Sequence, residues 1–300
     1  MNRRRFLTIS ASGLGAAVLP WRIGHAQGGI PSRVVIAGGA LTEIAVALGI
    51  GEHLVGVDTT SLYPWNVVEP LPKIGYLRTL GAEGVLSLNP TLLLVSDQAG
   101  PPGILDQLRG TKLPVVVVPE NFSSENVVDK IKAVAAALTV NGTDLADGVA
   151  ADFATVKSAL AKVVDRPKVL FILSAAGGRL MAAGSHTAAA SMIELAGGRN
   201  AIDGYEGYKP LSGESAIVAN PDFILVSTQT LESAGGKETL KALPMLAVLD
   251  AVKTDRLFVM EALYLLGFGP RTPYAVLDLA RFIHPRQTLP TLPSRAWMKV

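Results

Sequence analysis

The stretch GAEGVLSLNPTLLLVS, residues 81–96, aligns without gaps with SGESAIVANPDFILVS, residues 212–227. Six of the sixteen aligned positions are identical, including one glutamate in each copy (Glu83 and Glu214), an Asn-Pro pair and a final Leu-Val-Ser. Each copy predicts a short helix with an acidic residue in its first turn, ended by Asn-Pro and followed by a buried apolar strand. The repeat therefore predicts two similar α/β lobes, with a binding site in the cleft between them.

The sequence on either side of the repeat supports this division. Residues 33–140 and 168–285 alternate continuous apolar runs with helical patterns, which favours mostly parallel sheets covered on both faces. Residues 143–164 have apolar side chains at steps of three or four and predict one helix of roughly 33 Å. We expect this helix to join the lobes, although it could instead pack within one of them.

The expected organisation has four parts. Residues 1–26 form an export signal, and residues 27–141 form the N-terminal α/β lobe. Residues 142–167 carry the linking helix, and residues 168–300 form the C-terminal α/β lobe. Because a helical connector is stiffer than two or three crossing strands, we expect only small changes in the angle between the lobes on binding.

The chain begins with a pattern typical of exported proteins. Arg3, Arg4 and Arg5 precede a short, weakly apolar run that ends in small residues, with cleavage expected after Ala26. The two arginines followed by Arg-Phe-Leu predict a twin-arginine signal, and the alternative is an ordinary secretory signal. Both take the mature protein out of the cytoplasm, and an exported chain without cysteine is expected in the periplasm.

Composition excludes several classes of function. Residues 1–26 hold four arginines and no acid, so the mature chain has a formal charge of −2 and no basic excess for nucleic acid. The sequence has no cysteine, which excludes disulfides, thiolate metal sites and cysteine nucleophiles. A G-x-S-x-G elbow and paired histidine ligands are also missing, so a periplasmic hydrolase is a poor alternative.

One short segment suggests chemistry. Tyr76 stands two positions before Arg78, just upstream of the first repeat helix. A guanidinium beside a phenol favours phenolate, which is a hard anionic ligand suited to ferric iron and a known axial ligand of haem. From spacing alone, the alternative is a half-buried packing tyrosine and a solvated arginine.

A resemblance gives this segment its context. The mature chain resembles the haem-binding periplasmic proteins of bacterial haem ABC importers, a branch of the helical-backbone superfamily that also binds cobalamin and siderophores (class III periplasmic binding proteins). The motifs that carry the resemblance are GGALTE (38–43), VGVDTTS (55–61), IGYLR (74–78), EGYKPL (206–211) and LLGFGPRTP (265–273).

The resemblance implies a non-enzymatic, monomeric carrier that binds ferric haem b, its transported ligand, between the lobes. It implies that Tyr76 is the axial ligand to the iron and Arg78 its hydrogen-bonding partner. It also implies that Glu83 and Glu214 dock on a membrane permease dimer driven by a cytoplasmic ATPase. Without the resemblance, each glutamate is simply a carboxylate favoured by a helix N-terminus.

Some choices stay open at this stage. Arg179 and Arg271 are candidate haem-binding residues for the propionates, with Lys209 or backbone amides as alternatives. A cobalamin or ferric-siderophore carrier is the alternative function, and it would need no phenolate ligand. His186 is a candidate cleft residue, and His284, at the end of the last helix, is expected to be partly cationic. Aromatic residues that could line the cleft are Tyr63, Trp65, Tyr205, Tyr208, Tyr264 and Phe268.

Overall fold

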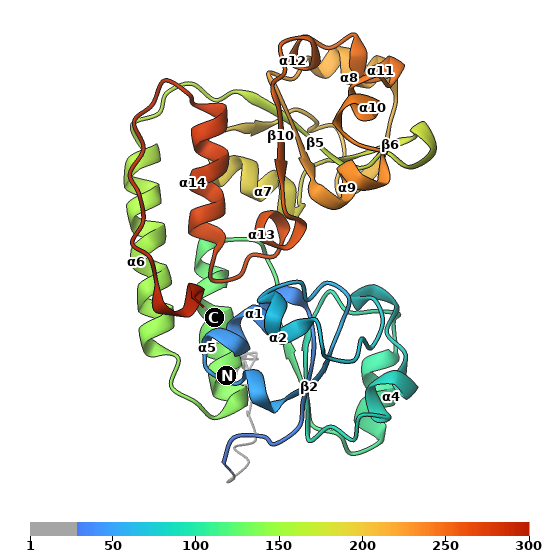
Figure 1. The fold of residues 1–300 in the computed structure, drawn as a ribbon, viewed down its shortest axis with the longest axis vertical. Helices are drawn as coiled ribbons and strands as arrows, with labels where there is room; N and C mark the ends of the chain where they lie inside the picture. The colour runs from blue at the N-terminus through green and yellow to red at the C-terminus, as the bar shows by residue number, and fades with distance from the viewer. Residues whose placement is uncertain (1–28, 300) are drawn as a thin grey trace, which may run out of the picture.

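The computed structural model describes residues 29–299, so the predicted export signal and its cleavage after Ala26 lie outside the described residues. The chain forms two lobes, one above the other in Figure 1, with long helices along one side. Within residues 29–299, no helix has both the length and the apolar character needed to cross a membrane.

The first lobe is built on a parallel sheet of four strands in the order β2-β1-β3-β4. Alternate residues of β1 and β3 pack into different cores, with Val34 and Ile36 on one face and Val35 and Ala37 on the other. Burial on both faces explains why these strands are continuous apolar runs. The strands are β1 (Val34–Ala37), β2 (Leu54–Val57), β3 (Leu92–Ser96) and β4 (Val115–Val118).

Helices cover both faces of this sheet. Buried residues of α1 and α5 belong to the larger core, and those of α3 and α4 belong to the smaller core on the opposite face. The helical elements are α1 (Gly39–Ala47), η1 (Gly51–His53), α2 (Trp65–Val68), η2 (Leu77–Thr79), α3 (Ala82–Leu86), α4 (Ile104–Gly110) and α5 (Ser124–Leu138).

The second lobe has a mixed sheet in the order β10-β9-β5-β6-β8, with β7 paired to β5. β5, β9 and β10 are parallel, but β6 runs antiparallel to both β5 and β8. The expected mostly parallel character is confirmed in the first lobe, and here the Gly-Gly turn between β5 and β6 reverses the chain. The strands are β5 (Lys168–Ser174), β6 (Leu180–Ala183), β7 (Arg199–Asn200), β8 (Tyr208–Leu211), β9 (Phe223–Ser227) and β10 (Leu257–Met260).

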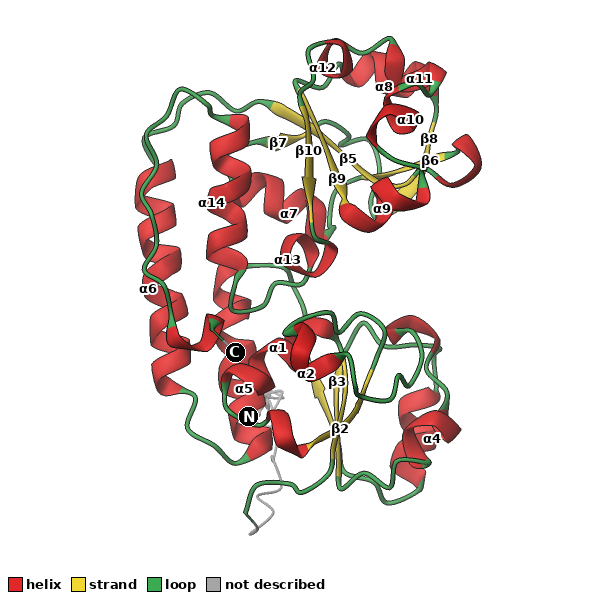
Figure 2. Ribbon diagram, in the orientation of Figure 1, coloured by secondary structure: helices red, strands yellow, loops and turns green. Residues whose placement is uncertain are grey.

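Short helices surround this sheet, and one long helix returns toward the first lobe (Figure 2). The short helices are η3 (Ala176–Gly178), α7 (Ala188–Leu195), α8 (Gly213–Ala219), α9 (Thr228–Ser233), α10 (Lys237–Lys241), α11 (Pro244–Ala247), α12 (Asp250–Lys253) and α13 (Ala262–Leu266), and the long helix is α14 (Thr272–Ile283). A last turn, η4 (Ala296–Met298), lies beside the first lobe.

The sequence repeat is a structural repeat. Residues 81–96 form α3 and β3, and residues 212–227 form α8 and β9. Asn89 and Asn220 adopt φ angles of 46° and 42°, a left-handed conformation that asparagine tolerates better than most residues. The proline that follows each asparagine prevents the helix from continuing, so both copies turn into a buried strand at the same position.

The linking helix is α6 (Thr143–Leu160). It packs on α5 of the first lobe and on α14 of the second lobe, which answers the question left open by its sequence. Its buried residues, such as Val149 and Phe153, belong to a core that contains residues of both lobes. The two lobes therefore share one core along the side of the molecule that α6 occupies.

Candidate functional site

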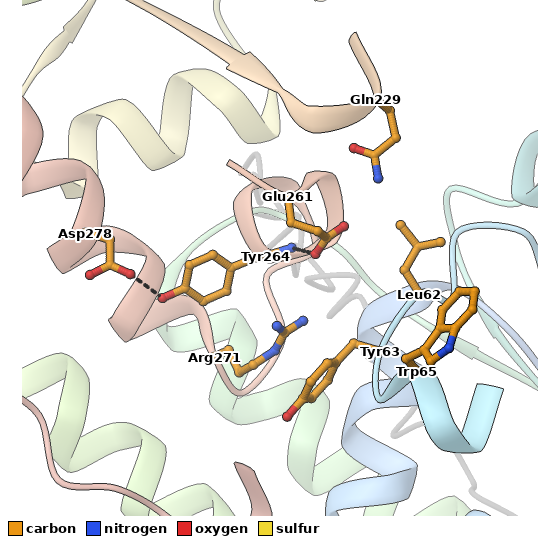
Figure 3. A pocket seen from close by; sticks show the side chains of 8 residues that line it. All are labelled: Leu62, Tyr63, Trp65, Gln229, Glu261, Tyr264, Arg271 and Asp278. Carbon is orange, nitrogen blue, oxygen red and sulfur yellow. Dashed lines mark hydrogen bonds between the residues drawn. The ribbon is translucent and has the colours of Figure 1, made fainter. Parts of the chain in front are cut away.

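A cavity of about 490 Å³ lies between the lobes (Figure 3). Its lining comes from segments that follow strands, namely the β2–α2 connection and the segments after β9 and β10. Ligand sites of open α/β sheets occur at the carboxyl ends of their strands, and this cavity has that position in both lobes. The lining residues are Leu62, Tyr63, Trp65, Gln229, Glu261, Tyr264, Arg271 and Asp278.

A buried aspartate shapes the first-lobe side of this cavity. Asp58 follows β2 and is fully buried. Its Oδ1 accepts hydrogen bonds from the Gly38 amide and the Ser61 hydroxyl, both at 2.9 Å. Its Oδ2 accepts from the Thr60 amide at 3.0 Å and from the Thr60 hydroxyl at 2.6 Å. These bonds satisfy the charge and fix the loop that carries Tyr63.

Tyr76 lies on the next loop of the same edge. The Thr59 amide donates to the carbonyl of Gly75 at 2.9 Å, which joins this loop to the one after β2. Gly75 has a φ of 103°, a conformation available to glycine, and turns the chain just before Tyr76, which is the N-cap residue of η2. Tyr76 is 47% exposed, so its phenol is open to a ligand.

In the second lobe, Tyr208 stands at the start of β8 and is partly buried against the larger core. Burial raises the pKa of the Tyr208 phenol, hydrogen bonding with Ala189 and Thr187 opposes this, and the positive charge of Arg78 lowers that pKa by a smaller amount. Tyr208 is therefore a neutral phenol, in contrast to the exposed Tyr76.

Arg271 is the cation that lines the cavity. Its Nε and Nη2 atoms donate to the two oxygens of Glu43 on α1, each at 3.0 Å, and its backbone amide donates to Glu43 Oε1 at 3.1 Å. The guanidinium carbon also lies 3.7 Å from the centre of the Tyr63 ring. Burial alone would lower the pKa of Arg271, but the carboxylate of Glu43 raises it. This ion pair joins the two lobes.

The two cavity tyrosines use their hydroxyl groups within the protein. Tyr264 donates to Asp278 Oδ2 at 2.8 Å, and Tyr63 donates to the carbonyl of Met298 at 3.1 Å (Figure 3 shows the first of these bonds). Burial and the charge of Asp278 raise the pKa of Tyr264 well above its ordinary value. Tyr264 is therefore a neutral phenol and unsuited to act as an anionic ligand.

Comparison with known proteins identifies the family. A family model described as periplasmic binding protein matches residues 34–263. This chain belongs to the periplasmic binding protein family. The sequence expectation is thereby confirmed at the level of family and fold, and membership assigns the chain to exported binding proteins and not to enzymes.

Solved structures and curated proteins resemble this periplasmic binding protein over most of its length. The periplasmic heme-binding protein RhuT from Roseiflexus sp. RS-1, in apo form, has a TM-score of 0.82 and 40% identity, covering 86% of this chain and 99% of that one. The periplasmic heme-binding protein BhuT in complex with two hemes has a TM-score of 0.79 and 42% identity, covering 84% and 97%. The Vitamin B12-binding protein of Vibrio vulnificus (strain CMCP6) is 25% identical over 250 residues, 81% of this chain and 87% of that protein.

Of the predicted site residues of this periplasmic binding protein, Arg271 lines the cavity, and Tyr76, Arg78 and the rest are not part of its lining. Arg179 is exposed at the end of the hairpin between β5 and β6, which projects from the second lobe (Figure 1). Glu83 and Glu214 are exposed in the first turns of α3 and α8, one on each lobe. His186 is exposed, with its Nδ1 3.5 Å from Glu206 Oε1.

Two expectations were wrong. His284 is buried and its ring Nε2 lies 3.1 Å from the carbonyl of Ala196, and burial lowers its pKa, so the imidazole is neutral and not partly cationic. Phe268 is fully buried in the core and does not line the cleft. Sequence reasoning also missed Glu43, because nothing near it in the chain indicates a partner 228 residues away.

Proposed function

We propose that this protein is the substrate-binding component of a haem ABC transporter and that it holds ferric haem b between its two lobes. The observation that carries the proposal is the position of Tyr76, an exposed phenol on a loop that is hydrogen-bonded to the one after β2, with Arg78 two positions later. The likeness to two solved heme-binding proteins at 40% and 42% identity supports it.

In this proposal, the phenolate of Tyr76 binds the ferric iron and Arg78 stabilises that phenolate with its charge. Apolar contacts with the porphyrin faces supply most of the affinity, at about 25 cal/mol per Å² before the costs of binding. Tyr208 is kept neutral by burial, so it contributes an apolar ring and a hydroxyl group and does not compete for the metal.

The haem propionates need cationic side chains with N–H donors that are not already used in hydrogen bonds within the protein. Arg271 uses its amide, Nε and Nη2 to hold Glu43, which leaves Nη1 for a propionate. Arg78 and Arg179 are both exposed and complete the proposed set of haem-binding residues. Because Arg271 is already neutralised by Glu43, we expect Arg78 to contribute more of the attraction for an anionic ligand.

A haemin titration of the mature protein, followed by absorption spectroscopy, tests the proposal. We expect a shifted Soret band and a charge-transfer band of a phenolate-bound ferric haem. Tyr76→Phe should remove the charge-transfer band and weaken binding by about tenfold or more, which is about 1.4 kcal/mol. A wild-type spectrum that does not change on adding haemin would refute the proposal.

Tyr205→Phe is the matched control for this titration. It also removes one hydroxyl group, which donates to the carbonyl of Ala182 at 3.1 Å inside the second lobe. We expect its haemin spectrum to keep the charge-transfer band. Loss of that band in both variants would show that the effect is not specific to Tyr76.

The names of curated relatives favour a second candidate, a carrier of cobalamin. Such a carrier needs the same two lobes and the same cleft but no phenolate ligand. Adding cyanocobalamin to the apoprotein separates the candidates, because cobalamin binding would be the same in wild type and Tyr76→Phe. A ferric siderophore would be distinguished by the same comparison.

We further propose that Glu83 and Glu214 dock the protein on a membrane permease dimer that a cytoplasmic ATPase drives. Their support is their placement, since each is exposed in the first turn of the same repeated helix and each belongs to a different lobe. The proposed carrier is a periplasmic monomer, exported by the twin-arginine signal of residues 1–26.

A further inference from the structure

The chain does not end with its last long helix. After α14, residues 285–299, which we name the strap, run back beside α6 toward the first lobe (Figure 1, the dark red segment that ends at C). The strap contacts α14 first: Arg281 Nη2 donates to the carbonyl of Pro290 at 2.6 Å, and the Tyr274 hydroxyl donates to that of Pro293 at 2.7 Å.

The middle of the strap is anchored on the linking helix. Arg295 donates to both oxygens of Asp152, at 2.6 and 3.0 Å, and to the carbonyl of Gly148 at 3.1 Å. The Asp152 side chain is only 2% exposed, so this pair satisfies a buried charge. Leu292 is buried in the core that the two lobes share, and Trp297 packs against it. A segment held by buried contacts has a fixed path.

The end of the strap reaches the ligand cavity. The carbonyl of Met298 accepts the hydroxyl of Tyr63, a residue of the first lobe 235 positions earlier that lines the cavity. The ring of Tyr63 lies 3.7 Å from the guanidinium carbon of Arg271, which in turn holds Glu43 of the first lobe. The strap, the ion pair between the lobes and the cavity therefore meet at one aromatic ring.

We propose that the strap fixes the angle between the lobes and that Tyr63 is the positioning residue through which it sets the width of the cleft. α6 and the core around it join the lobes along one side of the molecule, and the Glu43–Arg271 pair joins them beside the cavity. The strap adds a further connection from α14 across α6 to the β2–α2 segment. A cleft with a fixed width loses less freedom when a rigid ligand binds, so the strap would slow ligand release.

The experiment measures the distance between the lobes without any ligand. Because the chain has no cysteine, Gln107→Cys on α4 and Glu232→Cys on α9 give one pair of spin labels, one on each lobe. Both positions are exposed. Double electron–electron resonance then gives the distribution of distances in the labelled parent and in each variant.

Tyr63→Phe removes the bond to the strap and keeps the ring that covers Arg271. We expect this variant to give a broader distribution than the parent. Tyr205→Phe, which loses a hydroxyl–carbonyl bond of the same 3.1 Å length inside one lobe, should match the parent. A chain ending at Pro293, with Asp152→Asn to avoid an unpaired buried charge, should broaden it further. Thermal unfolding shows whether each variant is folded, and Tyr63→Phe decides the question if the shortened chain does not fold.

Unchanged distributions in folded Tyr63→Phe would overturn the proposal, because a purely structural hydroxyl would lower the melting temperature without moving the lobes. The proposal would also be overturned if Tyr205→Phe broadened the distance distribution as much as Tyr63→Phe. The measurement is made on apoprotein, so it decides the role of the strap even if haem proves not to be the ligand. Where haemin binds, Tyr63→Phe should also release it about threefold to tenfold faster.

Discussion

Replacing Glu43 by glutamine tests how firmly the two lobes are joined. The side chains of Glu43 and Arg271 are 4% and 13% exposed, so both charges are largely removed from water. Removing one partner of a buried ion pair costs about 3–5 kcal/mol, because the remaining charge stays buried without compensation. The glutamine amide has the same shape and its oxygen can still accept a hydrogen bond from the Arg271 backbone amide. The free energy of unfolding should therefore fall by about 3 kcal/mol.

The assay is thermal and urea unfolding of the ligand-free protein. For a protein of this size, 1 kcal/mol lowers the melting temperature by about 2–4 °C, so Glu43→Gln should lower it by roughly 6–12 °C. Lys253→Gln is the matched control, since its ion pair with Asp250 has side chains that are 57% and 75% exposed. An exposed pair of this kind contributes about 0.5 kcal/mol or less.

A double variant isolates the pair itself. Arg271→Met in the Glu43→Gln background removes the stranded charge, and we expect it to recover about 2 kcal/mol of the loss. A Glu43→Gln protein within about 1 kcal/mol of wild type would refute the reasoning. It would mean that water or another group compensates Arg271 and that this pair does not hold the lobes together.

Two further predictions concern pH and transport. The pKa of His284 is lowered by burial, so the unfolded chain binds a proton more readily as the pH falls below its ordinary value of 6.5. The free energy of unfolding should therefore fall below that pH by up to about 1.4 kcal/mol per unit, and His284→Gln should flatten this dependence in urea unfolding at several pH values. Glu83→Ala with Glu214→Ala should leave haemin titrations unchanged while abolishing haem uptake in cells; normal uptake would contradict docking through these residues.

The sequence predicted the elements that local pattern specifies. β1, β3 and β9 are apolar runs buried on both faces, and the Asn-Pro pairs end α3 and α8 at equivalent positions. Chain patterns of this kind depend on neighbours within a few residues. They therefore identify a strand or a helix end without knowledge of the rest of the fold.

The antiparallel part of the second sheet was not predicted. β6 has only four residues, and β8 contains Lys209 and Pro210, which are poor strand formers. β8 lies at the edge of its sheet, where a charged residue and a proline are tolerated and discourage pairing with another chain. Tertiary position, not local propensity, makes this segment a strand.

The cavity was predicted in part. Tyr63, Trp65 and Tyr264 were among the aromatic residues expected in the cleft, and they line it. Their partners could not be predicted, since Tyr63 meets Met298 235 positions away and Arg271 meets Glu43 228 positions away. A single sequence contains no signal for such pairs.

The contacts between the lobes, which we call the lobe interface, have a consequence for ligand release. Gly39 of α1 is so close to the second lobe that an added Cβ would lie 2.6 Å from Leu263 Cδ1, and opening the cleft must also disturb the Glu43–Arg271 pair and the strap. Spontaneous opening therefore costs several buried contacts, which favours retention of a bound ligand. In the proposed transport cycle, a permease binds Glu83 on one lobe and Glu214 on the other, so it contacts both sides of the lobe interface. The free energy of binding to both lobes can then offset the cost of breaking contacts that thermal motion alone rarely breaks.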